Sequence, residues 1–249
     1  MCNYHISFSP TGGTRKVGDI LCGELGGQWQ QVDLCKPVET MTLGREDVCL
    51  VSVPSYGGRV PAVAVERLGA IQGNGAKAVL VCVYGNRAWE DTLTELQDAL
   101  EKQGFVCGAA VAAVAEHSLF RQYGAGRPDG QDAAQLAGFA EKIRERLVLD
   151  VLPKLELEGS HGSYKDFGGV PFHPQPNKHC TACGLCAREC PVGAISPEGK
   201  TDKERCISCM RCVQVCPSNA RDMDSLAFRA AGAAMAAKLG GHKENHLFL

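Results

Sequence analysis

One cysteine pattern occurs twice in this chain, at a constant offset of 26 residues. Each copy reads C-x2-C-x2-C-x3-C-P, and an alanine follows three residues after each proline. The copies comprise Cys180, Cys183, Cys186 and Cys190, then Cys206, Cys209, Cys212 and Cys216. Three cysteines at such short intervals can wrap a tight loop, and the proline fixes φ where the chain must turn. The pattern therefore predicts two similar loops of cysteine thiols.

Loops of this kind suit three corners of a [4Fe–4S] cubane, whose fourth iron takes a cysteine from elsewhere. Structural zinc also uses C-x2-C pairs, but zinc needs four ligands per site rather than triplets repeated in register. Disulfides are disfavoured, because nothing in the sequence marks the chain as secreted. We therefore expect two [4Fe–4S] clusters, which carry electrons one at a time.

The duplicated pattern resembles that of the bacterial two-cluster ferredoxins, and the resemblance implies crossed ligands. One cluster would be held by Cys180, Cys183, Cys186 and Cys216. The other would be held by Cys206, Cys209, Cys212 and Cys190. The crossing would join both loops into one small pseudo-two-fold α+β unit, with clusters close enough to exchange electrons.

Length and composition extend the prediction beyond this unit. With 249 residues, the chain is too long for a ferredoxin alone and suggests one or two domains. A net charge of −2 argues against a nucleic-acid partner. The longest apolar run, residues 78–84, is too short to span a bilayer, and no signal-like segment opens the sequence. We therefore expect a cytoplasmic protein without a membrane span.

Six cysteines lie outside the duplicated pattern: Cys2, Cys22, Cys35, Cys49, Cys82 and Cys107. Cys49 and Cys82 fall within apolar, strand-like runs. Because free cysteine commonly behaves as a small buried hydrophobe, we interpret these six as structural or incidental.

The first 150 residues alternate between strand-like and helix-like patterns. Five predicted strands occupy residues 4–9, 29–33, 48–53, 78–84 and 105–114. Predicted helices occupy residues 14–25, 61–71, 90–102 and 131–149. Continuous apolar strands alternating with helices indicate a parallel sheet covered on both faces. We expect an α/β fold with a doubly wound five-stranded parallel sheet, whose ligand lies outside the carboxyl ends of the strands.

A loop rich in hydroxyls and glycine joins the first strand to the first helix. Hydroxyls and glycine amides at a helix N-terminus form an anion site. The loop lacks the lysine of a nucleotide P-loop and has no G-x-G-x-x-G. It resembles the phosphate loop of flavodoxins, [ST]-x-T-G-x-T, with Gly13 where asparagine is most common. The resemblance implies that the FMN phosphate is held by Ser9, Thr11, Gly12, Gly13 and Thr14.

Two further loops follow the third and fourth strands. They match in position the two flavodoxin loops that enclose the isoalloxazine, and each combines glycine with an aromatic residue. The residues that would contact FMN there are Ser55, Tyr56, Gly57, Gly58, Arg59, Tyr84, Gly85, Asn86, Arg87 and Trp89. Taken one at a time, Tyr56, Tyr84 and Trp89 are better explained by ordinary packing at a strand end.

The charges of the two loops also suggest how the reduction potential of FMN compares with that of the clusters. Arg59 and Arg87 are basic, and neither loop contains an acidic residue before Glu90. A guanidinium close to the flavin would stabilise the reduced anion. We therefore expect FMN to have a higher potential than the clusters, with the alternative that both arginines face solvent.

Residues 116–128 follow the fifth strand and would form a lid over the flavin. His117 in this loop could donate a proton, although a solvated loop histidine is the more common case. Residues 151–176 are rich in glycine and proline and are expected to form an extended linker. An alanine-rich helix is expected over residues 224–239, docked on the cysteine-rich unit, with a homodimer contact as the alternative.

The whole chain resembles the flavodoxin–ferredoxin fusion proteins of anaerobic bacteria and archaea. The resemblance implies an FMN domain at residues 1–150, the linker at 151–176, a ferredoxin domain at 177–224 and a helix and tail at 225–249. It implies electron transfer between two [4Fe–4S] clusters and FMN, with a protein as redox partner. Two alternatives remain: an FMN-dependent reductase fed by the clusters, and a redox sensor with a reactive thiol.

Overall fold

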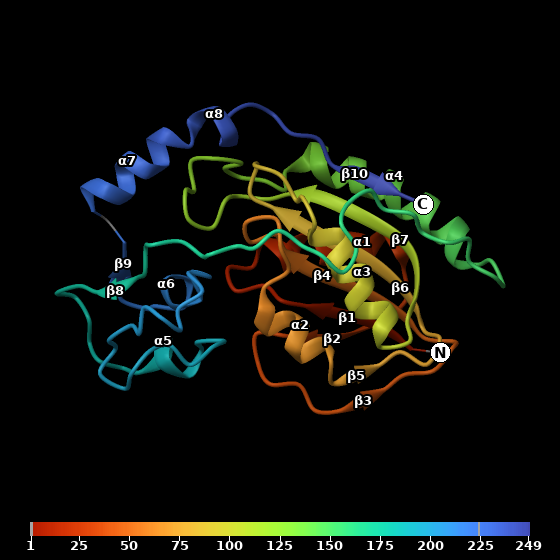
Figure 1. The fold of residues 1–249 in the computed structure, drawn as a ribbon, viewed down its shortest axis with the longest axis horizontal. Helices are drawn as coiled ribbons and strands as arrows, with labels where there is room; N and C mark the ends of the chain where they lie inside the picture. Colours follow the sequence, from red (N-terminus) through yellow and green to blue (C-terminus); the bar gives the residue numbers. More distant parts are fainter. Residues whose placement is uncertain (1, 224) are drawn as a thin grey trace.

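The computed structural model describes residues 2–223 and 225–249. Its N-terminal part contains five parallel strands: β1 (Asn3–Ser7), β2 (Trp29–Asp33), β4 (Val48–Pro54), β6 (Lys77–Tyr84) and β7 (Val106–Val114). Their order across the sheet is β2-β1-β4-β6-β7 (Figure 1). This is the flavodoxin-like 2-1-3-4-5 order of a doubly wound sheet. The flavodoxin-like α/β fold expected for this part is therefore confirmed.

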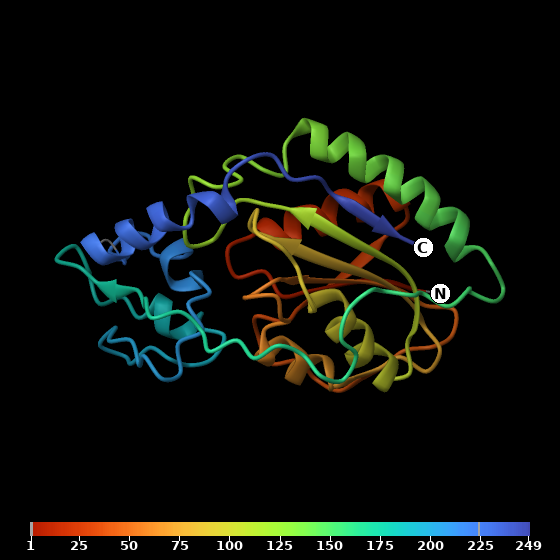
Figure 2. The ribbon, with the colours of Figure 1, turned by 45° about the horizontal axis from the view of Figure 1, so that its top comes forward.

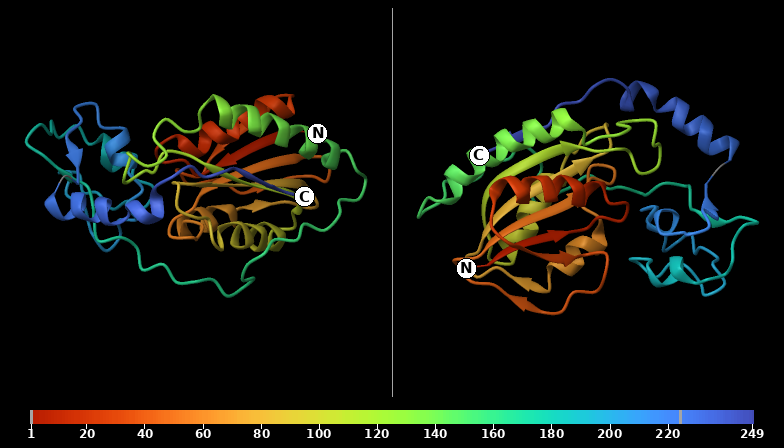
Figure 3. Two further views of the ribbon diagram at one scale, coloured as in Figure 1. Left: turned by 90° about the horizontal axis from the view of Figure 1, so that it is seen from above. Right: turned by 180° about the vertical axis from the view of Figure 1, so that it is seen from behind.

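Helices cover both faces of this sheet (Figure 3). One face packs against α1 (Gly13–Leu25) and α4 (Gly130–Leu147), the other against α2 (Ala62–Leu68) and α3 (Thr92–Lys102). Because water is excluded from both faces, nearly every residue of β4 and β6 is buried. Their uninterrupted apolar sequences reflect this double burial.

The sheet contains a sixth strand, so the expected five-stranded parallel sheet is wrong in this respect. β10 (His246–Phe248) pairs antiparallel with β7, with Leu247 opposite Val111. Its three residues are too few to show an alternating pattern. They become a strand because the C-terminal tail is brought to the open edge of β7. Two shorter strands, β3 (Met41–Thr42) and β5 (Ile71–Gln72), pair outside the main sheet.

The duplicated cysteine pattern lies in a small unit beyond the carboxyl edge of the sheet (Figure 1). We call residues 177–223 the cysteine-loop region. It contains two short helices, α5 (Leu185–Arg188) and α6 (Arg211–Gln214). An antiparallel pair, β8 (Gln175–Pro176) and β9 (Arg221–Asp222), joins its two ends.

The C-terminal helix differs from the expectation in its packing. It is divided into α7 (Leu226–Ala234) and α8 (Ala236–Leu239), and its predicted first residue, Asp224, lies outside the described residues. Phe228 stacks on Phe120 of the loop after β7, with ring centroids 5.0 Å apart. Tyr123 of the same loop donates a hydrogen bond to the Gly232 carbonyl at 2.9 Å. The helix therefore docks on the flavodoxin-like part, which corrects the expected docking on the cysteine-rich unit.

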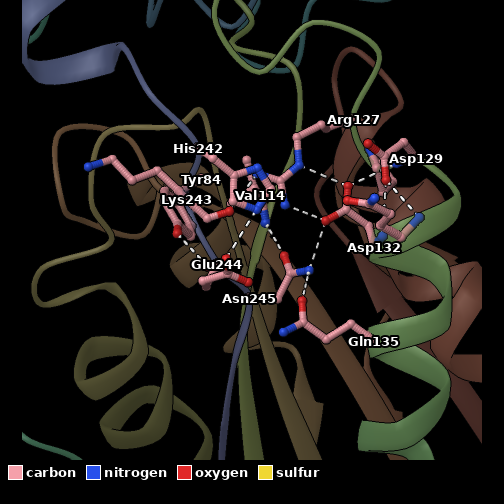
Figure 4. A network of polar contacts seen from close by, with 12 residues as sticks. Tyr84, Val114, Arg127, Asp129, Asp132, Gln135, His242, Lys243, Glu244 and Asn245 are labelled. Atoms are coloured by element: carbon pink, nitrogen blue, oxygen red, sulfur yellow. Dashed lines mark hydrogen bonds and ion pairs between the residues drawn. The ribbon is translucent and has the colours of Figure 1, made fainter.

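After α8 the tail runs back along the sheet to β10 (Figure 2). A buried polar network holds it there (Figure 4). Asn245 accepts a hydrogen bond from the Val114 amide at 2.8 Å and donates to Asp132 at 2.9 Å. Arg127 forms an ion pair with Asp132 and also donates to the Lys243 carbonyl. The chain therefore crosses to the cysteine-loop region and returns, so that both ends of that region are attached to the flavodoxin-like part.

The linker between the two parts is also attached. Leu155 is buried in the core beside α3. Asp98 of α3 accepts hydrogen bonds from His161 Nδ1 at 2.7 Å and from the Gly162 amide at 3.0 Å. The linker has the expected irregular backbone, but it packs along α3 rather than extending freely. In the described part of the chain, no helix has the length and apolarity needed to cross a membrane.

Candidate functional site

The two cysteine loops have the same backbone conformation at the same offset. Three pairs of residues separated by 26 positions have positive φ: Ala182 and Ser208, Gly184 and Met210, Gly193 and Asn219. α5 and α6 are separated by the same offset and have the same length. Left-handed backbone is unfavourable for residues such as Met and Ser, so its recurrence indicates that the curvature of each loop is required. The duplication in sequence is therefore a duplication in structure.

Each of two small cavities is lined by four of the eight cysteines. Cavity A is lined by Cys180, Cys183, Cys186 and Cys216. Cavity B is lined by Cys190, Cys206, Cys209 and Cys212. Each set joins three cysteines of one copy to the last cysteine of the other. The structure thus brings together the residues that the ferredoxin resemblance groups together.

Backbone amides in the same region are directed at cysteine sulfur. The Ala194 amide donates to Cys190 Sγ at 3.3 Å, and the Ala220 amide donates to Cys216 Sγ at 3.2 Å. Such hydrogen bonds stabilise the thiolate form, which is the form that ligates metal. Four thiols around each cavity fit a cubane. No three His, Cys, Asp or Glu side chains of residues 2–223 and 225–249 are arranged to hold a single metal ion, and a cubane separates its four ligands more widely than one ion does.

The two cavities differ in exposure. Cys180 and Cys183 of cavity A are exposed, whereas Cys209 and Cys212 of cavity B are buried. Cavity B faces the flavodoxin-like part, where Arg67 of α2 donates a hydrogen bond to the Pro191 carbonyl at 2.6 Å. Cavity A therefore faces solvent and cavity B lies between the two parts of the chain.

The predicted phosphate loop lies at the carboxyl end of β1, directly before α1. Gly12 has φ of 93°, a left-handed conformation that favours glycine. Ser9 Oγ accepts a hydrogen bond from the Arg15 amide at 2.9 Å and so stabilises the first turn of α1. The hydroxyl-bearing residues Thr11 and Thr14 lie at the edge of a cavity. Amides at a helix N-terminus beside these hydroxyls are suited to an anion.

This cavity, cavity C, has a volume of about 330 Å³ and is partly open to solvent. It lies at the carboxyl edge of the sheet, where ligands of doubly wound folds bind. Nine of the predicted FMN contacts line it: Thr11, Gly13, Thr14, Ser55, Tyr56, Gly57, Tyr84, Gly85 and Arg87. The three predicted loops therefore meet around one cavity.

Six predicted FMN contacts do not line cavity C: Ser9, Gly12, Gly58, Arg59, Asn86 and Trp89. Asn86 donates to the carbonyls of Leu239 and Gly241 and so attaches the C-terminal tail. Trp89 packs against Tyr84 and the β10 residue His246, at centroid distances of 5.2 and 5.0 Å. These two side chains hold the tail in place, a role that the sequence did not indicate.

The two arginines expected at the flavin are both neutralised by carboxylates. Arg59 forms a bidentate pair with Glu95 of α3, with both contacts at 2.8 Å, and its guanidinium also stacks over Tyr164. Arg87 lines cavity C but pairs with Glu90 at 2.8 Å. Glu90 was visible beside the second loop, but Glu95 of α3 was not visible in the loop sequences. The higher potential expected for FMN stays a prediction, with the Arg87 charge at cavity C offset by Glu90.

The loop after β7 forms one wall of cavity C, and His117 is one of the loop residues that line the cavity. His117 Nδ1 accepts hydrogen bonds from the amides of Leu119 and Phe120 at 3.1 and 3.2 Å. Burial and the nearby Arg87 charge lower the pKa of His117 to about 4. The ring is therefore neutral near pH 7, with its proton on Nε2. Nε2 can donate a hydrogen bond, but the ring is not a cationic acid.

Residues outside the predicted loops also line cavity C. The linker contributes Phe167, Val170 and Phe172, and the C-terminal helices contribute Ala231 and Met235. A side chain at Gly57 would collide with the Phe167 ring, with its Cβ 2.1 Å away. The linker and the C-terminal helices thus cover the side of the cavity that faces away from the sheet. Only the abundance of aromatic residues around 167–172 could have suggested this from the sequence.

Cavities B and C share a wall. Ile207 and Ser208, which lie between the ligand-type residues Cys206 and Cys209, line both cavities. Tyr56 also lines cavity C. Burial raises the pKa of the Tyr56 hydroxyl, and the nearby Cys209 thiol of cavity B raises it further. Cavity B is therefore separated from cavity C by a thin layer of side chains.

Comparison with known proteins gives partial matches. Residues 178–227 match the NosR family, which covers less than half of the chain. No curated protein matches this sequence. Over 58% of its length, the chain is similar in fold to a flavodoxin of Streptococcus pneumoniae TIGR4, at 19% identity, a TM-score of 0.43 and 99% coverage of that chain.

Two further solved structures show similarity of the same size. Oxidised flavodoxin 1 of Bacillus cereus matches 58% of this chain and 98% of its own, at 15% identity and a TM-score of 0.45. Rubredoxin oxygen:oxidoreductase of the anaerobe Desulfovibrio gigas matches 58% of this chain but 35% of its own, at 15% identity and a TM-score of 0.42. Similarities of this size carry no information about activity.

Proposed function

We propose that this chain transfers electrons between two [4Fe–4S] clusters and FMN within one molecule. The observation that carries the proposal is the wall of Ile207 and Ser208 shared by cavities B and C. A shared wall of two residues gives a short path between a cluster site and a flavin site. Clusters at these sites would pass single electrons, and FMN would accept two of them.

The chain's own residues have distinct roles in this proposal. The eight cysteines are ligands, grouped as they line cavities A and B. Thr11, Thr14 and the amides at the start of α1 bind the FMN phosphate. Tyr56 and Tyr84 flank the ring, and the neutral His117 donates a hydrogen bond from Nε2. The linker and the C-terminal helices exclude water from the far side of cavity C.

The exposure of the cysteines indicates where a redox partner would bind. Cys180 and Cys183 are at the surface, so a protein redox partner exchanges electrons at cavity A. The face of the flavin domain around cavity C is already occupied by the chain's own cysteine-loop region. Because free thiolates and iron–sulfur clusters persist in reducing compartments, we also propose that the protein is cytoplasmic.

A second candidate is an FMN-dependent reductase of a small organic substrate. Cavity C favours it, because the cavity is bounded by its own lid loop, by the linker and by two helices, and its volume of about 330 Å³ lies at the lower end of the usual 300–1,000 Å³ of ligand pockets. The aromatic side chains Phe120, Phe167 and Phe172 offer an apolar surface for such a substrate.

The test is anaerobic rapid-mixing reduction of the reconstituted full chain, followed separately at cluster and flavin wavelengths. We compare wild type with Cys190→Ala and with Cys2→Ala, whose exposed cysteine lies outside both cavities. Cys190→Ala should lose about half of its iron and slow flavin reduction at least tenfold, whereas Cys2→Ala should behave as wild type. Unchanged flavin reduction in Cys190→Ala despite the missing iron would contradict the proposed path.

A further inference from the structure

Arg221 lies at a position where the two copies of the duplicated pattern differ in charge. It follows Ala220, and the equivalent residue of the first copy, 26 positions earlier, is Ile195. The Arg221 side chain enters the cysteine-loop region from β9, and only 3% of the residue is exposed. One copy of the pattern thus buries an aliphatic side chain where the other buries a guanidinium.

The guanidinium of Arg221 lies beside a ligand-type cysteine of cavity A. Nη1 contacts Cys186 Sγ of cavity A at 3.5 Å and donates to the Gly199 carbonyl at 2.7 Å. Nη2 donates to the Pro174 carbonyl at 2.9 Å and to the Thr201 hydroxyl. Arg221 also lines cavity A.

Arg221 also reaches the wall of cavity B. Pro174, whose carbonyl accepts the hydrogen bond from Nη2 at 2.9 Å, lines cavity B together with Cys190, Cys206, Cys209 and Cys212. The guanidinium therefore contacts the walls of both cavities.

The charge of Arg221 has no carboxylate partner within residues 2–223 and 225–249. Its acceptors are carbonyls, a hydroxyl and cysteine sulfur, and its buried Nε has no hydrogen-bond partner there. Burying a guanidinium without a counter-charge is costly. Arg211, which also has a buried unpartnered Nε, differs because it forms an ion pair with Glu189.

We propose that Arg221 is the counter-cation shared by the two cluster sites, and that it raises the reduction potential of both. The inference rests on the proposed function, since it requires clusters in cavities A and B. A cluster held by four thiolates is anionic and becomes more so when it gains an electron. A buried cation beside it stabilises the reduced form more than the oxidised form, because the attraction grows with the charge. Ile195 supplies no such charge on the opposite side.

The experiment is an anaerobic redox titration of the reconstituted full chain, monitored by EPR, with iron content measured first. The variants are Arg221→Gln, which removes the charge, and Arg221→Lys, which keeps it. Arg205→Gln is the matched control, because Arg205 is exposed and donates to the Val192 carbonyl in the same region. Wild type without iron would refute the proposed function itself, independently of Arg221.

With iron bound, Arg221→Gln should shift the reduced-to-oxidised ratio of both clusters at least tenfold toward oxidised at a fixed potential. For a one-electron couple this is a fall in midpoint potential of about 59 mV. Arg221→Lys should remain within about threefold of wild type and Arg205→Gln within about twofold. If Arg221→Gln loses iron but Arg221→Lys retains it, the requirement for charge is supported. Unchanged potentials in a fully loaded Arg221→Gln, or loss of iron from both variants, would overturn the proposal.

Discussion

The flavodoxin-like part and the cysteine-loop region are stabilised in different ways. The largest fully buried side chains of the described chain all lie between Ile6 and Leu136. The cysteine-loop region has few buried apolar residues, and most of them are small: Ala194, Ile195, Cys209, Met210, Cys212 and Ala220. The first part has two layers of aliphatic core around a sheet. The cysteine-loop region has almost no aliphatic core, and its inward-facing groups are mainly thiols.

This difference follows from the size of a core that each part can build. A segment of fewer than about 50 residues buries too little apolar surface to fold alone and usually needs disulfides or metal. The cysteine-loop region has left-handed backbone at Ala182, Ser208 and Met210, which adds to the cost of folding. Ligand bonds to a bound group would supply what the core lacks. In one chain, apolar burial stabilises one part, and ligation would stabilise the other.

Removal of the proposed clusters should have the largest effect on local stability, and it should destabilise only the cysteine-loop region. We expect amides of residues 180–220 to exchange hydrogen at nearly unstructured rates after anaerobic chelation, because ligation would be their main source of stability. Amides of β4 and β6 should keep their protection. Hydrogen exchange with mass spectrometry measures both in one sample. Persistent protection of residues 180–220 in the iron-free chain would show that the contrast between the two parts is false.

A change in the phosphate loop should have the opposite selectivity. Thr11→Asp places a carboxylate beside the proposed phosphate, and repulsion of about 3 kcal/mol would weaken FMN binding roughly a hundredfold. The cluster absorption should not change. Thr11→Asn is the matched control, since it has nearly the same shape without the charge. Equal FMN affinity of the two variants, measured by fluorescence titration, would argue against a phosphate at this loop.

The C-terminal tail tests how far the two parts are joined. Asn245→Ala removes three hydrogen bonds and leaves the Val114 amide without its acceptor. We expect a cost of about 2 kcal/mol, seen as roughly thirtyfold faster amide exchange in residues 244–248. Lys243→Ala is the control, because only its backbone carbonyl contacts Arg127. Equal exchange in the two variants would mean that the network in Figure 4 does not hold the tail.

The same contrast explains what the sequence could predict. The central strands β4, β6 and β7 were visible because burial on both faces requires long, mainly apolar runs such as Val48–Pro54. The two cysteine loops were visible because ligand spacing repeats at a fixed offset, and their crossed grouping was implied by the resemblance to two-cluster ferredoxins. β10, the docking of α7 and the roles of Asn86 and Trp89 were not visible, since each depends on where the tail returns in space. Arg59 was misjudged for the same reason, as its partner Glu95 is 36 residues away.

The smallest predicted effect concerns residues 159–165 of the linker, which hydrogen bonds attach to α3. Asp98 accepts hydrogen bonds from His161, from the Gly162 amide and from the Tyr164 hydroxyl. The hydrogen bond to Asp98 raises the pKa of His161 above its usual value of 6.5. A raised folded-state pKa stabilises the attached linker fully below pH 6.5, and this contribution is lost as pH rises through the folded pKa.

Because His161 is exposed, the effect should be small, a few-fold change in exchange rate at most. After correction for the intrinsic pH dependence of exchange, amides of residues 159–165 should be more protected at pH 6 than at pH 8. His161→Gln should abolish the difference while leaving β4 and β6 unaffected. If wild type showed the same corrected protection at both pH values, the hydroxyl of Tyr164 and the amide of Gly162 would suffice to hold the linker, and His161 would be an uninvolved surface residue.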